Sequence, residues 1–363
     1  MKCKWGDIIS LEYGKPVADK NSLNGPVPVY GTNGEIGTSW LPPLCNNASV
    51  ILGRKGAYRG VHYSSKPFSV IDTAFYVKPL ITDLNLLWVY YKFLTYDINR
   101  MDSGSAIPST DRYEIYSLPL DLPELSIQNT VADTLSALDT KIFNNKMVNH
   151  HLEQMARAMY NEFLTSGSGS DGIIADIADI NLHSYSPREK WDFVNYLDTS
   201  NITRGVISEI QFITDVNDLP SRARRKVTAR DIIYSTVRPN QRHYGLVSAP
   251  IDNMLVSTGF SVIHSNDHSV SNEYLYMLLS SDAVTEQLQA VAEQSVSTYP
   301  SIKPSDIGSL GVFIPSNGED LHGQLHLIFE KISNANDENR RLAALRDALL
   351  PRLMSGELSV ADL

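Results

Sequence analysis

The sequence predicts an α+β fold in which two mixed α/β lobes are separated by two long antiparallel helices that form a coiled coil. The two halves of the chain end alike, because residues 105–109 (SAIPS) match residues 297–301 (STYPS) at an offset of 192. Each match leads into a long helical pattern, in which Lys141 falls on Lys331 at an offset of 190. A repeat of this period is too long for a solenoid array, so it predicts two similar lobes.

Composition places the chain among ordinary globular proteins. Its 42% hydrophobic and 20% charged residues are ordinary proportions, and a length of 363 residues is enough for two or three domains with their own cores. No stretch approaches the ~18 apolar residues of a membrane-spanning helix, and the first residues lack the apolar core of a signal peptide. We therefore expect a cytoplasmic protein with no membrane partner. Cys3 and Cys45 are too few for a disulfide framework or a zinc site, so we expect reduced thiols.

Residues 1–124 are predicted to form the first lobe. Short apolar runs at 27–30 (VPVY), 48–52 (ASVIL) and 70–77 (VIDTAFYV) are divided by Gly and Pro, which is typical of strands joined by turns. One helix is expected within the lobe, over residues 84–99.

Residues 125–165 are predicted to form the first long helix, and 317–363 the second helix with a C-terminal tail. Residues 166–172 (SGSGSDG) between them have the composition of a flexible linker, and residues 173–316 should form the second β-rich lobe. In both helices apolar and amide side chains recur at alternating spacings of four and three. The predicted seams are Ile127, Val131, Leu135, Leu138, Ile142, Asn145, Asn149, Leu152, Ala156, Met159 and Phe163 in the first helix, and Leu321, Leu325, Ile328, Ile332, Ala335, Asn339, Leu342, Leu345, Leu349 and Leu353 in the second.

One amphipathic helix cannot bury its seam alone, so the two helices should pack on each other in antiparallel pairing. Leu152 and Leu342 then contribute to the helix pairing, and Asn149 and Asn339 lie near the middle of the seam. If buried, the two amides would pair and fix the register. Alternatively, both face solvent at the edge of the seam.

The net charge of −10 argues at first against nucleic acid, because phosphate binding needs clustered Lys and Arg. The basic residues are unevenly spread, however, and eight of them lie between Arg204 and Arg242. The sequence thus allows a local positive face on an acidic body.

The sequence contains no catalytic signature that we can identify. Residues 31–37 (GTNGEIG) are glycine-rich but lack the Lys-Ser/Thr of a phosphate loop. The nine histidines have no metal-ligand spacing, and no paired-carboxylate nuclease pattern is present. We therefore expect no catalytic residue, no metal site and no cofactor in this chain.

The remaining candidates are basic residues interleaved with aromatic and polar ones, which we place in loops. Arg and Lys can read guanine or hold phosphate, Gln can read adenine, and loops on a rigid scaffold often carry recognition. One such cluster is more often a solvated face, but two clusters on two duplicated lobes favour DNA contact. The predicted DNA-binding residues are Arg54, Lys55, Tyr58, Arg59 and His62 in the first lobe, and Arg222, Arg224, Arg225, Lys226, Arg238, Gln241, Arg242 and His243 in the second.

The chain resembles the specificity subunits of type I restriction-modification systems over nearly its whole length. The resemblance is carried by segments that include 5–9 (WGDII), 51–56 (ILGRKG), 138–142 (LDTKI) and the ending 345–356 (LRDALLPRLMSG). The usual Pro-Pro-Leu-x-Glu-Gln start of the first helix appears here only as 122–128 (LPELSIQ), which is a departure from the family pattern.

The resemblance implies a non-catalytic subunit with two target-recognition domains, each reading half of a bipartite asymmetric site on double-stranded DNA. It also implies that the helices set the unread gap and dock two methylation (M) subunits, with restriction (R) subunits in the full complex. S-adenosylmethionine, ATP and Mg would belong to those partners.

Two other interpretations stay open at this point. A coiled-coil scaffold whose lobes bind proteins rather than DNA would suit the acidic net charge. A standalone enzyme would need a catalytic constellation that the sequence does not supply.

Overall fold

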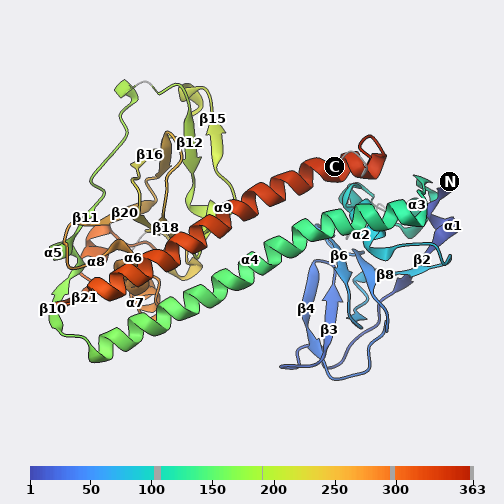
Figure 1. The fold of residues 1–363 in the computed structure, drawn as a ribbon, viewed down its shortest axis with the longest axis horizontal. Helices are drawn as coiled ribbons and strands as arrows, with labels where there is room; N and C mark the ends of the chain where they lie inside the picture. Colours follow the sequence, from blue (N-terminus) through green and yellow to red (C-terminus); the bar gives the residue numbers. More distant parts are fainter. Residues whose placement is uncertain (102–107, 190, 295–298, 360–363) are drawn as a thin grey trace. The chain divides into compact units, whose positions relative to one another are not determined.

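The computed structural model describes residues 1–101, 108–189, 191–294 and 299–359. Parts of both copies of the repeated motif, 102–107 and 295–298, lie outside the described residues. The chain divides into two compact units, unit 1 (Met1–Phe143 with Arg340–Leu363) and unit 2 (Asn144–Asn339). Each unit contains one lobe together with part of each long helix (Figure 1).

The long helices are α4 (Leu125–Ser166) and α9 (Glu319–Ser355), and they pair antiparallel inside each unit (Figure 1). In unit 1 the Arg346 guanidinium donates to the Asp139 carboxylate at 2.7 Å, and in unit 2 the Asn149 amide donates to Asn336 at 2.9 Å. Ten residues forward on α4 thus correspond to ten residues back on α9, as antiparallel pairing requires. No helix in the described part of the chain is long and apolar enough to cross a membrane.

Most seam positions are buried or half-buried, which confirms the heptad prediction, but Ile127 and Leu345 are exposed. At the start of α4, Gln128 takes the buried place instead. Its amide accepts from Asn85 N at 2.9 Å and donates to Pro123 O at 2.9 Å. Main-chain groups at a helix start need partners, so a hydrogen-bonding side chain outcompetes an apolar one at this position.

The prediction that Asn149 and Asn339 pair with each other is wrong, because each amide has a different partner. Asn149 is buried and bonds to Asn336, whereas Asn339 accepts from the Asn145 amide at 3.0 Å. The antiparallel register places residue 149 opposite 336 and residue 145 opposite 339, so Asn149 and Asn339 lie in different layers of the seam.

The lobe of unit 1 is built on a four-stranded antiparallel sheet in the order β2-β8-β5-β6. Its core contains Trp5, whose buried ring stacks on Phe93 at 4.5 Å. The strands are β2 (Ile9–Tyr13), β8 (Ala74–Pro79), β5 (Ser49–Gly53) and β6 (Val61–Ser64), with β4 (Gly34–Ser39), β3 (Val27–Gly31) and β7 (Ser69–Val70) in a second sheet, and β1 (Lys2–Lys4) paired with β9 (Pro119–Asp121).

The helices of this lobe are short. They are α1 (Trp5–Ile8), α2 (Leu86–Leu94), the 3₁₀ helix η1 (Ile98–Arg100) and α3 (Arg112–Ser117). The expected single helix over 84–99 is thus shorter. It ends at Leu94 with Thr95 as its C-cap, where both the main-chain N–H and the hydroxyl of Thr95 donate to the Lys92 carbonyl, at 3.1 Å and 2.8 Å.

Unit 2 repeats this plan with the sheet order β11-β20-β17-β18. The central strands β5 and β17 are buried at all five positions, as expected for a strand covered on both faces. The strands are β11 (Ala178–Ile180), β20 (Phe260–Ser265), β17 (Asp231–Ser235) and β18 (Tyr244–Val247), with β15 (Gln211–Ile213), β12 (Val194–Leu197), β19 (Met254–Ser257) and β16 (Ala223–Lys226) in a second sheet. The hairpin β13 (Ile202–Thr203) and β14 (Val206–Ile207) and the helices α5 (Ile174–Ile177), α6 (Asn272–Leu279), α7 (Asp282–Glu293) and α8 (Pro304–Gly308) complete the unit. The matching orders confirm the duplication and the predicted α+β fold class.

The segment 166–172, expected as a flexible linker, is largely regular structure. Ser166 ends α4, and β10 (Gly169–Ile173) pairs antiparallel with β21 (Gly311–Pro315), as β1 pairs with β9 in unit 1. A Cβ at Gly169 would lie 2.2 Å from the Ile314 carbonyl oxygen. Glycine is therefore needed there for close backbone approach rather than for flexibility.

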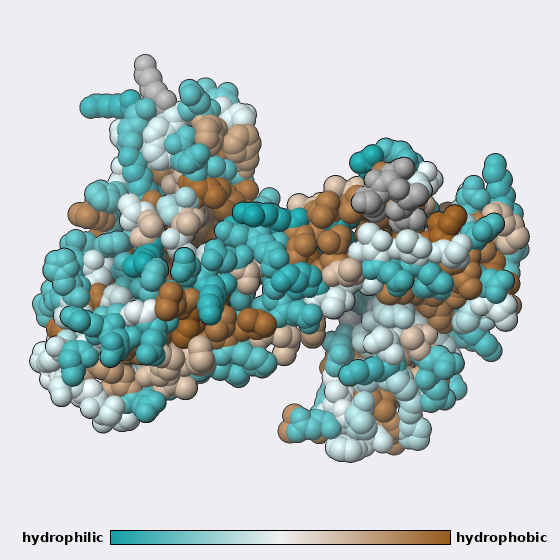
Figure 2. Space-filling view, viewed as in Figure 1, coloured by the Kyte–Doolittle hydropathy of each residue, from teal (hydrophilic) through white to brown (hydrophobic). Residues whose placement is uncertain are grey.

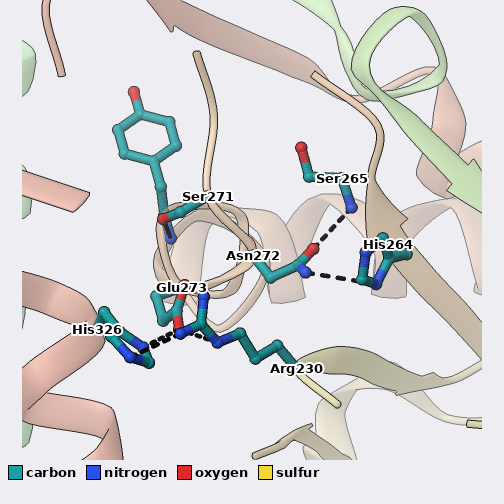
Figure 3. A network of polar contacts seen from close by, with 8 residues as sticks. Arg230, His264, Ser265, Ser271, Asn272, Glu273 and His326 are labelled. Carbon is teal, nitrogen blue, oxygen red and sulfur yellow. Dashed lines mark hydrogen bonds and ion pairs between the residues drawn. The ribbon is translucent and has the colours of Figure 1, made fainter. Parts of the chain in front are cut away.

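A polar network ties the sheet of unit 2 to α6 and α9 (Figure 3). Glu273 on α6 is buried, and its carboxylate lies 3.6 Å from Arg230 Nε and 3.1 Å from His326 Nδ1. Beside it, Asn272 accepts from the Ser265 main-chain N–H at 2.6 Å. Because Arg230 directly precedes β17 and His326 lies on α9, the network fixes β17 against the helix within unit 2.

Candidate nucleic-acid interface

Two loops occupy matching places in the two lobes. Loop A (residues 54–60) joins β5 to β6, and loop B (residues 236–243) joins β17 to β18. In each loop, a main-chain hydrogen bond of 2.8 Å joins the end of the preceding strand to the last residue of the loop. In each loop, the first residue also donates a main-chain hydrogen bond of 2.8 Å to a neighbouring turn. The closing bonds run from Gly53 N to Gly60 O and from Ser235 N to His243 O, and the contacts run from Arg54 N to Thr73 O and from Thr236 N to Gly259 O.

Three predicted residues of loop A are accessible. The Arg54 guanidinium lies over the Tyr13 ring, 4.7 Å from its centroid, and donates to the Asp72 carbonyl at 3.0 Å. Lys55 forms an ion pair of 3.4 Å with the Asp72 carboxylate. Tyr58 is 65% exposed at the tip of the loop. These side chains can present a hydrogen-bonding and aromatic surface to a ligand.

Arg59 was predicted to contact DNA, and the structure corrects this prediction. Its side chain is 2% exposed and points inward, where Nη2 donates to the carbonyls of Asn99 at 2.7 Å and Ile98 at 3.3 Å. These carbonyls belong to η1, so the guanidinium ties the loop to that helix. The residue anchors the loop instead of facing a ligand.

His62 is half-buried on the strand β6, directly after loop A, which corrects its predicted loop position. A Cβ on Gly60 would lie 2.4 Å from its Nε2 atom, so the ring packs against the main chain of the loop. Burial lowers the pKa of His62 from its ordinary value of 6.5. The neutral imidazole thus packs against the loop main chain at Gly60.

Loop B is held by outward contacts. The Arg238 guanidinium lies over the Tyr299 ring at 5.0 Å, and Arg242 forms an ion pair of 2.7 Å with Asp282 at the start of α7. Gln241 is exposed, and His243 Nδ1 lies 2.6 Å from the Ile202 carbonyl oxygen. Arg238 and Gln241 are therefore available to a ligand, whereas Arg242 and His243 also fix the loop.

The basic cluster at 222–226 belongs largely to the strand β16, which corrects its predicted loop position. Arg222 is exposed and Arg224 is half-buried, so both remain accessible. Lys226 is paired with Glu189, and its ammonium group lies over the Trp191 ring at 5.3 Å.

Arg225 is half-buried on the same strand, and its Nη1 atom donates to the Ser184 hydroxyl at 3.4 Å. Burial lowers the pKa of its guanidinium. Within the cluster 222–226, Arg222 and Arg224 are thus the side chains best placed to contact a ligand.

One turn brings Arg222 next to loop B. Thr258 N donates to the Arg222 carbonyl at 2.8 Å, and the adjacent Gly259 carbonyl accepts from Thr236 N, the first residue of loop B. The two basic clusters of the second lobe therefore lie on either side of the same turn.

Sequence reasoning missed Arg112 at the start of α3. Its guanidinium lies over the ring of Tyr13, 5.0 Å from the centroid, on the same ring that Arg54 contacts. The main chain brings the two arginines together, because Thr110 N donates to the Arg54 carbonyl at 2.8 Å. The sequence signal that could have identified Arg112 is its position shortly after the repeated motif, which ends at Ser109.

The helix-pairing residues lie in the helix seams. Leu152 packs against the hydrophobic core of unit 2, and Leu342 is half-buried. Among the described residues, no group of His, Cys, Asp or Glu is arranged to hold a metal ion.

Comparison with known proteins adds independent findings. The family model of the type I restriction modification DNA specificity domain matches residues 2–154. The specificity subunit of the type I restriction enzyme HindI from Haemophilus influenzae is 35% identical over 130 residues, a match that spans 35% of this chain and only 28% of that protein. The specificity subunit of the type I restriction enzyme MjaIX from Methanocaldococcus jannaschii is 24% identical over 306 residues. That match covers 76% of this chain and 70% of that protein.

Among solved structures, the S subunit of a type I restriction-modification system from M. genitalium has the same fold. The TM-score is 0.67 at 14% identity, covering 97% of this chain and 95% of that one. In its matched specificity domain over residues 2–154, in these relatives and in this fold, the chain is similar to the specificity subunits of type I restriction-modification systems.

Proposed function

We propose that this chain is the DNA-recognition subunit of a type I restriction-modification complex, in which each lobe reads one half of a bipartite asymmetric site on double-stranded DNA. The observation that carries the proposal is the pair of loops A and B, which leave a duplicated scaffold at the same point with different side chains. Protein symmetry is mirrored in the symmetry of the DNA site, so two lobes with unlike loops suit two unlike half-sites.

The long helices would set the gap between the half-sites and dock two methylation subunits, with restriction subunits joining the full complex. Both helices keep large apolar side chains more than half exposed, namely Phe143, Val148 and Leu327. Figure 2 shows hydrophobic residues gathered along α9 on the face in view. Side chains of this kind are what a partner subunit would cover.

We assign methyl transfer and cleavage to the partner subunits, with S-adenosylmethionine, ATP and Mg bound there. This chain would act as a non-catalytic reader in the cytoplasm. Its relatives are specificity subunits, which supports this division of labour.

The test is selection from a random duplex pool with the chain co-purified with its methylation subunit. We expect two short enriched motifs at one fixed gap. A single motif would contradict reading by both lobes. No enrichment from a folded complex would contradict DNA recognition itself and favour a scaffold that binds proteins.

A shortened variant in the same selection tests the role of the helices. Residues 141–147 lie opposite 338–344 in the antiparallel register, so deleting both removes one heptad and keeps the seam in phase. The deletion shortens the helices by about 10 Å, and we expect the same two motifs with a gap about three base pairs shorter. An unchanged gap would contradict a spacing role.

A further inference from the structure

Two arginines of unit 1 share one aromatic ring. Tyr13 ends β2 and is 45% exposed, Arg54 opens loop A, and Arg112 opens α3. The guanidinium carbons lie 4.7 Å and 5.0 Å from the Tyr13 centroid, so the two positive charges are at most about 10 Å apart. Cation–π attraction offsets part of their mutual repulsion.

Neutral groups hold both guanidiniums in place. Arg54 donates to the Asp72 carbonyl at 3.0 Å and also lies 5.7 Å from the Phe75 centroid. Arg112 donates to the Tyr113 hydroxyl at 3.1 Å and lies 5.0 Å from the centroid of that ring. The side chains are thus positioned before any ligand arrives, which lowers the entropy cost of binding.

The nearby carboxylates are occupied elsewhere. The Asp72 carboxylate pairs with Lys55 at 3.4 Å, and Asp111 caps α3 by accepting from Tyr113 N at 2.8 Å. Within the described ranges, neither Arg54 nor Arg112 forms an ion pair with a carboxylate. An uncompensated pair of positioned guanidiniums favours an anion with several acceptor oxygens.

We propose that Arg54 and Arg112, on the shared ring of Tyr13, form a binding site for a backbone phosphate of DNA beside loop A. The inference rests on the proposed function and adds a contact that anchors the first lobe. The repeat offset of 192 places Pro304 at the position matching Arg112, so the second lobe has no counterpart of this arginine. Phosphate contacts position a protein on DNA while base contacts specify the sequence, so this site would orient loop A.

The experiment measures the salt dependence of binding to a mixed-sequence duplex by fluorescence anisotropy, using the chain co-purified with its methylation subunit. Each phosphate contact contributes about one unit to the slope of log affinity against log salt. Arg54→Ala and Arg112→Ala should each lower the slope, and the double variant should lower it by about one unit in total, because both arginines hold the same phosphate. An unchanged slope for both single variants would overturn the site.

Arg100→Ala is the matched control. Arg100 is exposed and already paired with Asp97 at 2.9 Å, so its removal subtracts the same charge and should leave the slope unchanged. Arg112→Gln keeps a long polar side chain and serves if the alanine variant does not fold. If the unmodified complex has a steep slope and Arg112→Gln does not lower it, this site is rejected and the proposed function is not. A flat slope for the unmodified complex would reject the proposed function.

Discussion

Loops A and B leave the same scaffold through the same main-chain bonds, yet they are anchored in opposite directions. Loop A turns Arg59 inward onto the carbonyls of η1, whereas loop B turns Arg242 outward onto Asp282. The duplicated sheet thus fixes where a loop begins and ends, while the anchoring side chain is free to differ. This freedom is what two lobes need if they are to read different sequences.

The backbone of the two loops differs at one matched position. Gly56 N donates to Pro108 O at 3.0 Å and Arg238 N donates to Pro300 O at 2.9 Å, so these residues are equivalent. Gly56 has a φ of 122°, and Arg238 has a φ of 49° in the left-handed region. Loop A therefore requires glycine, and loop B places a long basic side chain at the same corner.

The largest expected effect separates the two anchors. Arg59→Ala removes the buried guanidinium that donates to the Asn99 and Ile98 carbonyls and should lower the free energy of unfolding of unit 1 by about 3 kcal/mol. Arg242→Ala removes an ion pair with an exposed carboxylate and should cost less than about 1 kcal/mol. Urea unfolding of the two variants measures both values. Equal losses would contradict the assignment of Arg59 as the buried anchor.

A smaller effect is expected at the matched corner. Gly56→Ala forces a side chain into a φ region that L residues rarely adopt and should cost about 2 kcal/mol, although no neighbour lies closer than 3.7 Å to the new Cβ. Arg238→Asn should be nearly neutral, because asparagine tolerates the left-handed region. Urea unfolding measures both values. A Gly56→Ala variant as stable as the unmodified chain would contradict the requirement for glycine.

The smallest effect concerns pH and involves one histidine in each unit. Burial lowers the pKa of both His62 and His322 from the ordinary value of 6.5. Below that value the unfolded chain binds protons that the folded chain does not, so stability falls with falling pH until both states are protonated. His62→Gln should therefore reduce the loss of stability between about pH 7.5 and about pH 5.5. If the loss is the same with and without His62, its burial does not contribute.

The duplication, the heptad helices and the β-rich lobes could be predicted from sequence because spacing carries that information. The direction of individual side chains could not. Arg54 and Arg59 are indistinguishable as letters in one loop, but η1 offers carbonyls only to Arg59. The sequence predicts a loop for the cluster 222–226, whereas pairing with β19 makes most of it a strand.

The contact between Arg112 and Tyr13 joins residues that are distant in sequence, and it depends on the main-chain bond between Thr110 and Arg54. No local sequence pattern predicts it. For the same reason the amide partners in the helix seam followed from the observed register and not from the heptad pattern alone.

The measurement that tests the central claim most directly is duplex selection repeated with one loop altered at a time. We predict that Gln241→Ala in loop B changes the preferred bases in one half-site only. Tyr58→Ala in loop A should change the other half-site, with the gap constant in both experiments. A variant in either loop that alters both half-sites, or neither, would contradict independent reading by two duplicated lobes.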